Sequence, residues 1–295
     1  MLSVYRLYSI SIGELLRPVS INMAPSGLAI LMGAGPTTAA GIARILAHPS
    51  HGNMAVALLS RTGDASLAER LSRESQGGTL RAFKTDTSEA SLTSVFDEIK
   101  SWSQSQNLKL NMAIWNIKHS HKTPFEDESA TKFGDSLQTY VTGAMVFSQL
   151  SLKWMLSQDP SDTETDPSGV ETMTKKGTII FTGTLGALRT NAGYAAYGAG
   201  RAGVRMLAQS LAREYSARGV HVVHAIANGG IVDANTSAAH EGDSEAKELK
   251  ERITKVNLGE KIRAESVGKL YLQCMNQPCD LWVHELDMRP AREKF

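Results

Sequence analysis

Seven short apolar runs follow one another along the chain from residue 28 onwards, with more polar segments between them. Several are apolar at almost every position, which is the pattern of a parallel strand covered on both faces. The predicted strands are LAILM (28–32), MAVALL (54–59), LRAF (80–83), MAIWNI (112–117), TIIFTG (178–183), HVVHAIA (221–227) and LWVHEL (281–286).

Helical spacing appears between these runs. Apolar residues recur every three or four positions over 42–46, after the first strand, and again over 92–99. Alternation of strands and helices predicts an α/β fold, a doubly wound sheet of seven mainly parallel strands flanked by helices. One domain over residues 23–295 fits the pattern better than two.

Two polar segments interrupt the alternation. Residues 157–176 are acidic and contain two prolines, so we expect an exposed, mobile loop. Residues 238–261 are strongly charged and follow the sixth strand, where either a solvated helix or a lid over a site is expected. We assign about 234–261 to a substrate loop.

The first 22 residues carry two arginines and one acidic residue before a second methionine, Met23. A weak organelle-targeting peptide is one interpretation. The interpretations we favour are an extended gene model or a disordered N-terminal extension ahead of the fold.

Composition narrows the classes of partner. The chain has 295 residues, with 31 basic and 30 acidic side chains, and this balance gives no global attraction to nucleic acid or to an anionic membrane. No apolar run approaches the roughly 18 residues that span a bilayer. The two cysteines, Cys274 and Cys279, form neither a disulfide framework nor a complete zinc site, so we predict no metal and a reduced, cytoplasmic setting.

A glycine-containing turn follows the first strand. Gly33 and Gly35 let the backbone come close to a phosphate, and the helix that follows points its amides at the same place. Thr37 and Ala39 stand where a dinucleotide fingerprint has further glycines, so an ordinary strand–turn–helix is an equal alternative. The second strand ends in Ser60-Arg61, and an arginine there favours a 2′-phosphate, hence NADP(H) over NAD(H).

The segment YAAYGAGRAG (194–203) places Tyr197 and Arg201 four residues apart, on one face of a predicted helix. A phenol ordinarily titrates near pH 10, so it needs help to exchange a proton at neutral pH. A fixed positive charge beside it supplies that help, although alanine and glycine also suit a closely packed helix.

The chain resembles the short-chain dehydrogenase/reductase family over roughly residues 26–290, as an atypical member. The motifs that carry the resemblance are Asp86-Thr87 after the third strand, Asn116 in IWNIK (114–118), Thr184 thirteen residues before Tyr197, and HAIANGGIVD (224–233). The resemblance implies a Rossmann-type sheet.

Several residues depart from the family pattern near the expected chemistry. Thr184 keeps a hydroxyl in place of serine, and Arg201 stands where the family has lysine. Tyr140 takes the place of an asparagine that often supports a proton-relay water, while His224 and Asn228 replace asparagine and proline.

The resemblance also implies roles for individual residues. Tyr197 would protonate a developing alkoxide, Thr184 would donate a hydrogen bond to the same oxygen, and Arg201 would stabilise tyrosinate and contact the nicotinamide ribose. The cofactor-binding residues implied are Gly33, Gly35, Thr38, Arg61, Asp86, Thr87, Asn116, Gly229 and Ile231.

Three functions follow from these expectations. The first is an NADP(H)-dependent carbonyl reductase or alcohol dehydrogenase that acts on a small molecule. A non-redox isomerase, dehydratase or cyclase on the same scaffold, and an NADP-binding sensor without turnover, are the alternatives. We also expect a homodimer or homotetramer, built through the helix from about Tyr194 to Ser216, because its small residues permit close packing.

His119 and His121 form a pair just beyond the fourth strand, where loop residues or substrate contacts are expected rather than a metal site. Tyr194 lies one turn before Tyr197, and either pocket lining or packing would account for it. Trp102 and Trp154 are expected in the core or at an interface.

Overall fold

The computed structural model describes residues 24–159, 161–235 and 243–293. The predicted N-terminal extension and the first part of the predicted substrate loop lie outside the described residues. None of the helices in the described ranges is long and apolar enough to cross a membrane.

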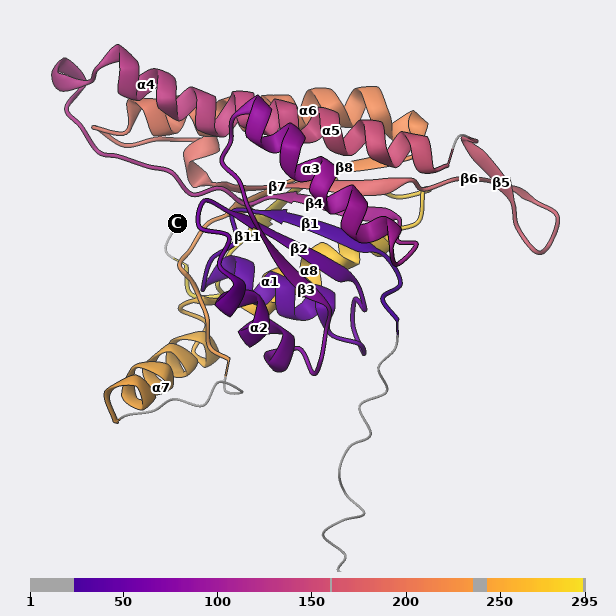
Figure 1. Cartoon of the computed structure of the whole chain (residues 1–295). Helices are drawn as coiled ribbons and strands as arrows, with labels where there is room; N and C mark the ends of the chain where they lie inside the picture. The colour runs from indigo at the N-terminus through magenta and orange to yellow at the C-terminus, as the bar shows by residue number, and fades with distance from the viewer. Residues whose placement is uncertain (1–23, 160, 236–242, 294–295) are drawn as a thin grey trace, which may run out of the picture.

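A parallel sheet of seven strands forms the centre of the molecule, with the order β11-β8-β7-β4-β1-β2-β3 (Figure 1). Strand order reverses between β1 and β4, which is where a doubly wound sheet binds its ligand. The predicted fold class is confirmed. The strands are β1 (Leu28–Met32), β2 (Ala55–Ser60), β3 (Leu80–Lys84), β4 (Leu110–Trp115), β7 (Gly177–Thr184), β8 (Val220–Ala227) and β11 (Glu285–Met288).

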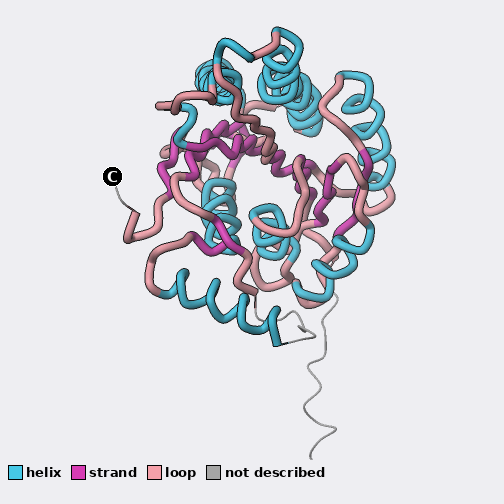
Figure 2. Tube along the Cα trace, turned by 90° about the vertical axis from the view of Figure 1, so that its left-hand side faces the viewer, coloured by secondary structure: helices cyan, strands magenta, loops and turns pink. Residues whose placement is uncertain are grey.

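Helices cover both faces of the sheet and give three layers (Figures 1 and 2). One face packs against α1 (Thr38–Ala47), α2 (Ala65–Glu74) and α8 (Ala264–Asn276). The other packs against α3 (Glu89–Gln104), α5 (Gly143–Gln158) and α6 (Ala195–Tyr215). Helix α4 (Ala130–Leu137) lies against α6, and a short π-helix (Gln138–Thr142) joins α4 to α5. Three single 3₁₀ turns cover Phe125–Asp127, Leu185–Ala187 and Ser216–Arg218.

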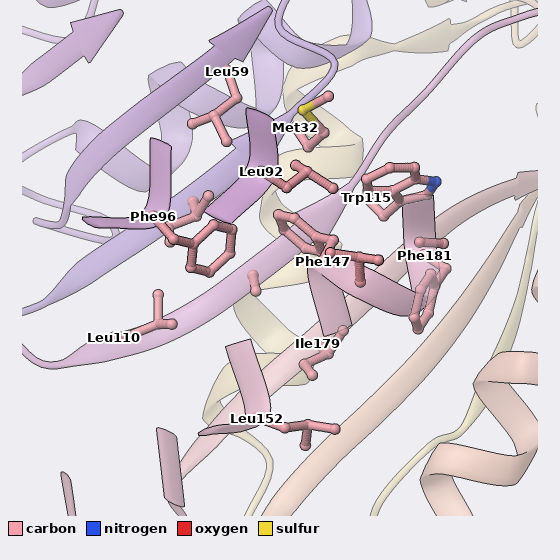
Figure 3. Close-up of a cluster of buried hydrophobic side chains, with 14 of the residues drawn as sticks. Met32, Leu59, Leu92, Phe96, Leu110, Trp115, Phe147, Leu152, Ile179 and Phe181 are labelled. Carbon is pink, nitrogen blue, oxygen red and sulfur yellow. The ribbon is translucent and has the colours of Figure 1, made fainter. Parts of the chain in front are cut away.

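Buried side chains from the strands and from α3 and α5 interlock between the layers, as Figure 3 shows. Phe96 of α3 meets Phe147 of α5 edge-on, with ring centroids 5.6 Å apart. Phe147 in turn packs against Trp115 at the end of β4. Such aromatic pairs add about 0.5–1.5 kcal/mol to the stability that burial provides. The core therefore fixes the end of β4, where the loop that begins at Asn116 leaves the sheet.

The two predicted tryptophan positions belong to this core. Trp102 and Trp154 are partly buried against it, and each ring lies within 6.4 Å of a phenylalanine ring, Phe83 and Phe96 respectively. The core interpretation explains both residues.

The predicted strand LWVHEL (281–286) is wrong over its first four residues. β11 pairs with β8 only from Glu285, opposite His224, and residues 281–284 form an irregular segment. One backbone hydrogen bond, from the His224 amide to the His284 carbonyl at 2.9 Å, reaches this segment. Side chains make its other contacts: the Trp282 ring stacks on His221 at 4.9 Å, and the His284 ring contacts the Val222 carbonyl at 2.9 Å.

The loop predicted over 157–176 is instead a hairpin of β5 (Thr163–Thr165) and β6 (Glu171–Met173). The Asp166 carboxylate closes its turn by accepting hydrogen bonds from the amides of Ser168 and Val170, and Gly169 takes a φ of 85°. Aspartate, proline and glycine thus build an ordered turn rather than a loop without structure. The hairpin and α7 (Asp243–Asn257) extend from opposite ends of the sheet (Figure 1).

Candidate active site

A cleft of about 820 Å³ lies at the carboxyl ends of β1, β4, β7 and β8. Every residue that the sequence suggested for catalysis or cofactor binding lines it, although the individual roles remain predictions. These residues are Gly33, Gly35, Thr38, Arg61, Asp86, Thr87, Asn116, Thr184, Tyr197, Arg201, Gly229 and Ile231.

The glycine turn is shaped to bring backbone to the floor of the cleft. Gly33 has a φ of 90°, and a Cβ there would lie 2.3 Å from the Asn116 carbonyl oxygen, so only glycine fits. A Cβ at Gly35 would have no described atom within 4 Å, so the turn is open on that side. No described side chain caps the N-terminus of α1. The free amides and dipole of this helix therefore face the cleft, where they suit an anion.

Asn116 ties this turn to the end of β4. Its side-chain amide donates to the Gly33 carbonyl at 3.3 Å, and its backbone amide donates to the Met32 carbonyl at 2.9 Å. The residue that carried the family motif therefore also holds the glycine turn in place.

Arg61 and Asp86 stand at the end of the cleft formed by the β2 and β3 loops. The exposed Arg61 side chain has no hydrogen bond or ion pair with any described residue, whereas Ser60 shapes the turn by accepting from the Gly63 amide at 3.1 Å. The hydroxyl and amide of Ser88 donate to the Asp86 carboxylate at 2.6 and 2.8 Å and lower its pKa. Asp86 is therefore a fixed anion that can accept further donors.

Thr184 and Tyr197 share a short hydrogen bond inside the cleft. Their side-chain oxygens are 2.5 Å apart, although they come from the end of β7 and the first turn of α6. Gly186 permits this approach, since a Cβ there would lie 2.5 Å from the Tyr197 ring. The spacing of thirteen residues thus corresponds to a shared hydrogen bond.

Arg201 is buried, with 4% of its surface exposed, and lies against the same tyrosine. Its two terminal nitrogens donate to the carbonyls of Thr182 and Ile117, both at 3.0 Å. Its guanidinium carbon lies 5.4 Å from the centroid of the Tyr197 ring and 4.4 Å from that of Tyr140. The cation is thus fixed between the ends of β7 and β4 and two aromatic rings.

Tyr140 completes this arrangement from the π-helix before α5. Its hydroxyl donates to the His119 carbonyl and accepts from the His119 amide at 2.8 Å. Burial raises the pKa of the phenol, so it stays protonated. A Cβ at Gly200 would lie 2.7 Å from the ring, so α6 needs glycine there. Tyr140 therefore holds the loop after β4 through its backbone.

The loop after β4 forms one side of the mouth of the cleft. His119 lines the cleft, and the His121 ring contacts the Glu128 carboxylate at 2.7 Å. Tyr194 lies beside Tyr197, with ring centroids 6.0 Å apart. Among the described residues no group of three or more histidine, cysteine, aspartate or glutamate side chains could hold a metal ion.

Some contributors were not found from the sequence. Lys118 and Ser120 line the cleft after β4, where irregular loop sequence gives no periodic signal. Gly41 was missed although it is a glycine of α1: a Cβ there would lie 2.3 Å from the Ala264 backbone, so Gly41 lets α1 pack closely on α8. The glycine lacking at Ala39 is thus present one half-turn later.

Comparison with known proteins agrees with this geometry. The model of the short chain dehydrogenase family matches residues 28–245. A search of curated proteins found no match. The chain therefore belongs to the short-chain dehydrogenase/reductase family, a family of oxidoreductases that use a nicotinamide cofactor.

Three solved structures show the same fold at low identity. A short-chain dehydrogenase from Rhodopseudomonas palustris is 22% identical, with 90% of this chain and 98% of that one covered and a TM-score of 0.65. A 3-oxoacyl-[acyl-carrier protein] reductase from Brucella melitensis, in complex with NAD, is 16% identical, with 89% and 95% covered and a TM-score of 0.66. An alcohol dehydrogenase from the archaeon Thermococcus sibiricus, complexed with 5-hydroxy-NADP, is 16% identical, with 91% and 98% covered and a TM-score of 0.66.

Proposed function

We propose that the protein is an NADP(H)-dependent carbonyl reductase or alcohol dehydrogenase that acts on a small organic substrate. The contact of 2.5 Å between the Thr184 and Tyr197 oxygens carries this proposal, because it sets two hydroxyl groups to meet one substrate oxygen. Both groups line the same cleft as the glycine turn and Arg61.

In the direction of reduction, Tyr197 gives its proton to the substrate oxygen as negative charge develops there. Thr184 donates a hydrogen bond to the same oxygen and fixes the substrate at Tyr197. A positioned proton donor of this kind contributes on the order of 10²–10⁴ to the rate. In oxidation the same two groups act in reverse, and Tyr197 receives the proton.

Arg201 acts through its charge. The guanidinium lies against the Tyr197 ring, where its charge offsets negative charge that develops on the phenol oxygen during proton transfer, but an arginine does not release a proton in proteins. It donates directly to the Ile117 carbonyl and cannot take part in a proton relay as a lysine could. Tyr197 must therefore regain its proton by another path, and we expect slow turnover.

The residues present fit a nicotinamide dinucleotide phosphate. The open turn at Gly35 and the uncapped amides of α1 would hold the pyrophosphate, Arg61 the 2′-phosphate and Asp86 the adenine. Gly229 and the backbone of Ile231 would meet the nicotinamide end. When bound, the nicotinamide supplies the two-electron step as donor or acceptor of hydride.

The proposal is tested by incubating the pure protein with NADPH and a panel of ketones, quinones and enones. Absorbance follows the loss of NADPH, and mass spectrometry follows the product. We expect both to change together with at least one substrate, and both to fall in Tyr197→Phe. Product formation without loss of NADPH would instead identify an isomerase, dehydratase or cyclase, and tight NADPH binding without any turnover would identify a sensor.

A further inference from the structure

A buried ionic cluster is centred on Arg44, in the last turn of α1. The Arg44 side chain is 4% exposed and donates to three carboxylates from different parts of the chain. It contacts Glu74 of α2 at 2.7 Å, Glu265 of α8 at 2.5 Å, and both oxygens of Asp233 at 2.6 and 3.1 Å. These elements are thus joined through one guanidinium.

Such a cluster is costly if it serves stability alone. Taking charges out of water costs free energy that their mutual attraction often only balances, and apolar side chains of the same volume frequently serve as well. The cluster does, however, fix the relative orientation of its members. A planar guanidinium that holds a carboxylate by two hydrogen bonds fixes that carboxylate in position and orientation. The cluster is therefore better suited to positioning the segments that it joins than to increasing the free energy of unfolding.

The position of Asp233 shows which segment is aligned. Asp233 directly follows β9 (Ile231–Val232), and Ile231 lines the cleft at the end expected for nicotinamide. On its other side this segment pairs with β10 (Ile262–Arg263), and Arg263 donates to the Ala234 carbonyl at 2.9 Å. Arg44 is thus the link between this segment and α1, whose N-terminus faces the expected pyrophosphate.

We propose that Arg44 and Asp233 are positioning residues, which hold the nicotinamide-binding segment 229–235 in register with the phosphate-binding end of α1. The inference rests on the proposed function, since it assigns the two ends of the cleft to the two halves of NADP(H). Neither Arg44 nor Asp233 is among the residues that line the cleft. They act by keeping the distance between the nicotinamide subsite and the phosphate subsite fixed.

The test compares Asp233→Asn with the unmutated protein in the binding of NADPH and of adenosine 2′,5′-bisphosphate, which fills only the adenosine half. Arg44 keeps Glu74 and Glu265 in this variant, and thermal unfolding verifies that it is folded. We expect the Kd for NADPH to rise about tenfold and that for the bisphosphate to stay within about twofold. Equal weakening of both ligands, or no weakening of NADPH, would overturn the inference.

Arg70→Met is the matched control. Arg70 also donates to Glu74, at 2.8 Å, but it is 35% exposed and does not contact Asp233. We expect both affinities to be unchanged in Arg70→Met. A loss of NADPH affinity equal to that of Asp233→Asn would show that general charge at the cluster matters rather than the link to Asp233.

A second measurement does not depend on the cofactor. Amide hydrogen exchange over residues 231–235 should become faster in Asp233→Asn, while exchange in α1 stays slow. Unchanged exchange over 231–235 in the folded variant would overturn the inference. Failure of the proposed function would show instead in the unmutated protein, as absence of NADPH binding or of turnover.

Discussion

At the scale of single residues, two departures from the family pattern depend on each other. Arg201 stands in the place of lysine and Tyr140 in that of asparagine, and the guanidinium lies 4.4 Å from the centre of the Tyr140 ring. The Tyr140 hydroxyl is occupied by the His119 backbone, and Arg201 is occupied by two carbonyls. The pair therefore forms a rigid cationic support behind Tyr197, in positions where the family has a relay.

Substitutions at Tyr197 and Arg201 test this support. Tyr197→Phe should lower kcat by about 10²-fold or more, because the proton donor is lost while the ring stays. Arg201→Lys should keep or raise kcat, since lysine restores a group that can release a proton, whereas Arg201→Met should lose turnover and some cofactor affinity. Steady-state kinetics with NADPH measures all three. Turnover of Tyr197→Phe at the unmutated rate would show that the chemistry lies elsewhere.

Arg61 should set the choice of cofactor. Its exposed guanidinium lines the cleft without a partner among the described residues, so it is available for a 2′-phosphate. We expect NADPH to bind about tenfold more tightly than NADH, from one charge-assisted contact of about 1.5–3 kcal/mol. Arg61→Ala should erase most of this difference and leave the Kd for NADH nearly unchanged in fluorescence titration. Equal affinities in the unmutated protein would contradict the assignment.

The sequence located these residues but not their partners. The spacing of Thr184 and Tyr197 predicted a shared site through the resemblance to the short-chain dehydrogenase/reductase family, which has the same spacing. The carbonyls that Arg201 contacts belong to Thr182 and Ile117, and every residue has a carbonyl, so no residue type marks them. Arg44 and Asp233 likewise are 189 positions apart and gave no local signal.

At the scale of elements, α6 uses its small residues within the chain. A Cβ at Gly198 would lie 2.9 Å from Thr190, one at Gly200 would lie 2.7 Å from Tyr140, and one at Gly203 would lie 2.8 Å from Val141. The two interpretations of YAAYGAGRAG, a closely packed helix and a helix that carries a catalytic tyrosine, are therefore compatible. Glycine brings α6 close enough for Arg201 to reach the ends of two strands.

Gly200→Ala should show how far the site depends on this approach. The added methyl group would meet a fully buried ring, so the helix or Tyr140 must shift, at a cost of about 1–3 kcal/mol in the free energy of unfolding. Denaturant unfolding measures this cost. Glu98→Gln, at an exposed position of α3 outside the predicted interface, should change the free energy of unfolding by less than about 0.5 kcal/mol. Equal stabilities of Gly200→Ala and the unmutated protein would show that Tyr140 moves freely.

The elements of the sheet were predictable because burial on both faces leaves a continuous apolar run, as in LAILM, which matches β1 residue for residue. Hairpin β5–β6 has exposed side chains on one strand and no apolar pattern, and its turn depends on the hydrogen bonds of a single aspartate. Segment 281–284 was wrongly predicted as strand because Trp282 and Val283 are typical strand residues. In the structure the Trp282 ring stacks on His221, and the Val283 carbonyl contacts the His221 ring at 2.9 Å.

At the scale of the whole molecule, we predict assembly into a homodimer or homotetramer through α6. Met206 of this helix is 51% exposed, and Ala199 and Ala202 are exposed on it as well, so a second copy could pack closely there. Light scattering at micromolar concentration should give two or four times the monomer mass of 31.9 kDa. Met206→Glu should reduce that mass, because a buried carboxylate without a partner disfavours the interface. A monomer in the unmutated protein would contradict the prediction.

Stability in acid should depend on His224, which is buried between β7, β11 and α6 and is 1% exposed. Burial lowers its pKa from 6.5 to about 4; Glu285 of β11 opposes this shift, while Arg205 and Arg201 of α6 add to it. Between these two pKa values the unfolded chain therefore binds a proton that the folded chain does not. Protonation therefore favours the unfolded chain. The free energy of unfolding is undiminished above pH 6.5 and falls by on the order of 3 kcal/mol as the pH falls towards 4.

Urea unfolding at pH 7.0, 5.5 and 4.5 measures this loss. Burial lowers the pKa of His221 from 6.5 to about 4 as well. His224→Asn removes one of these two titrating rings and should therefore roughly halve the decline in the free energy of unfolding over this range, whatever its effect at pH 7. His51→Asn, in an exposed turn, should leave the slope as it is in the unmutated protein. If His224→Asn loses stability with falling pH as steeply as the unmutated protein, another buried group controls acid unfolding, and the ring of His224 takes up its proton without cost to the fold.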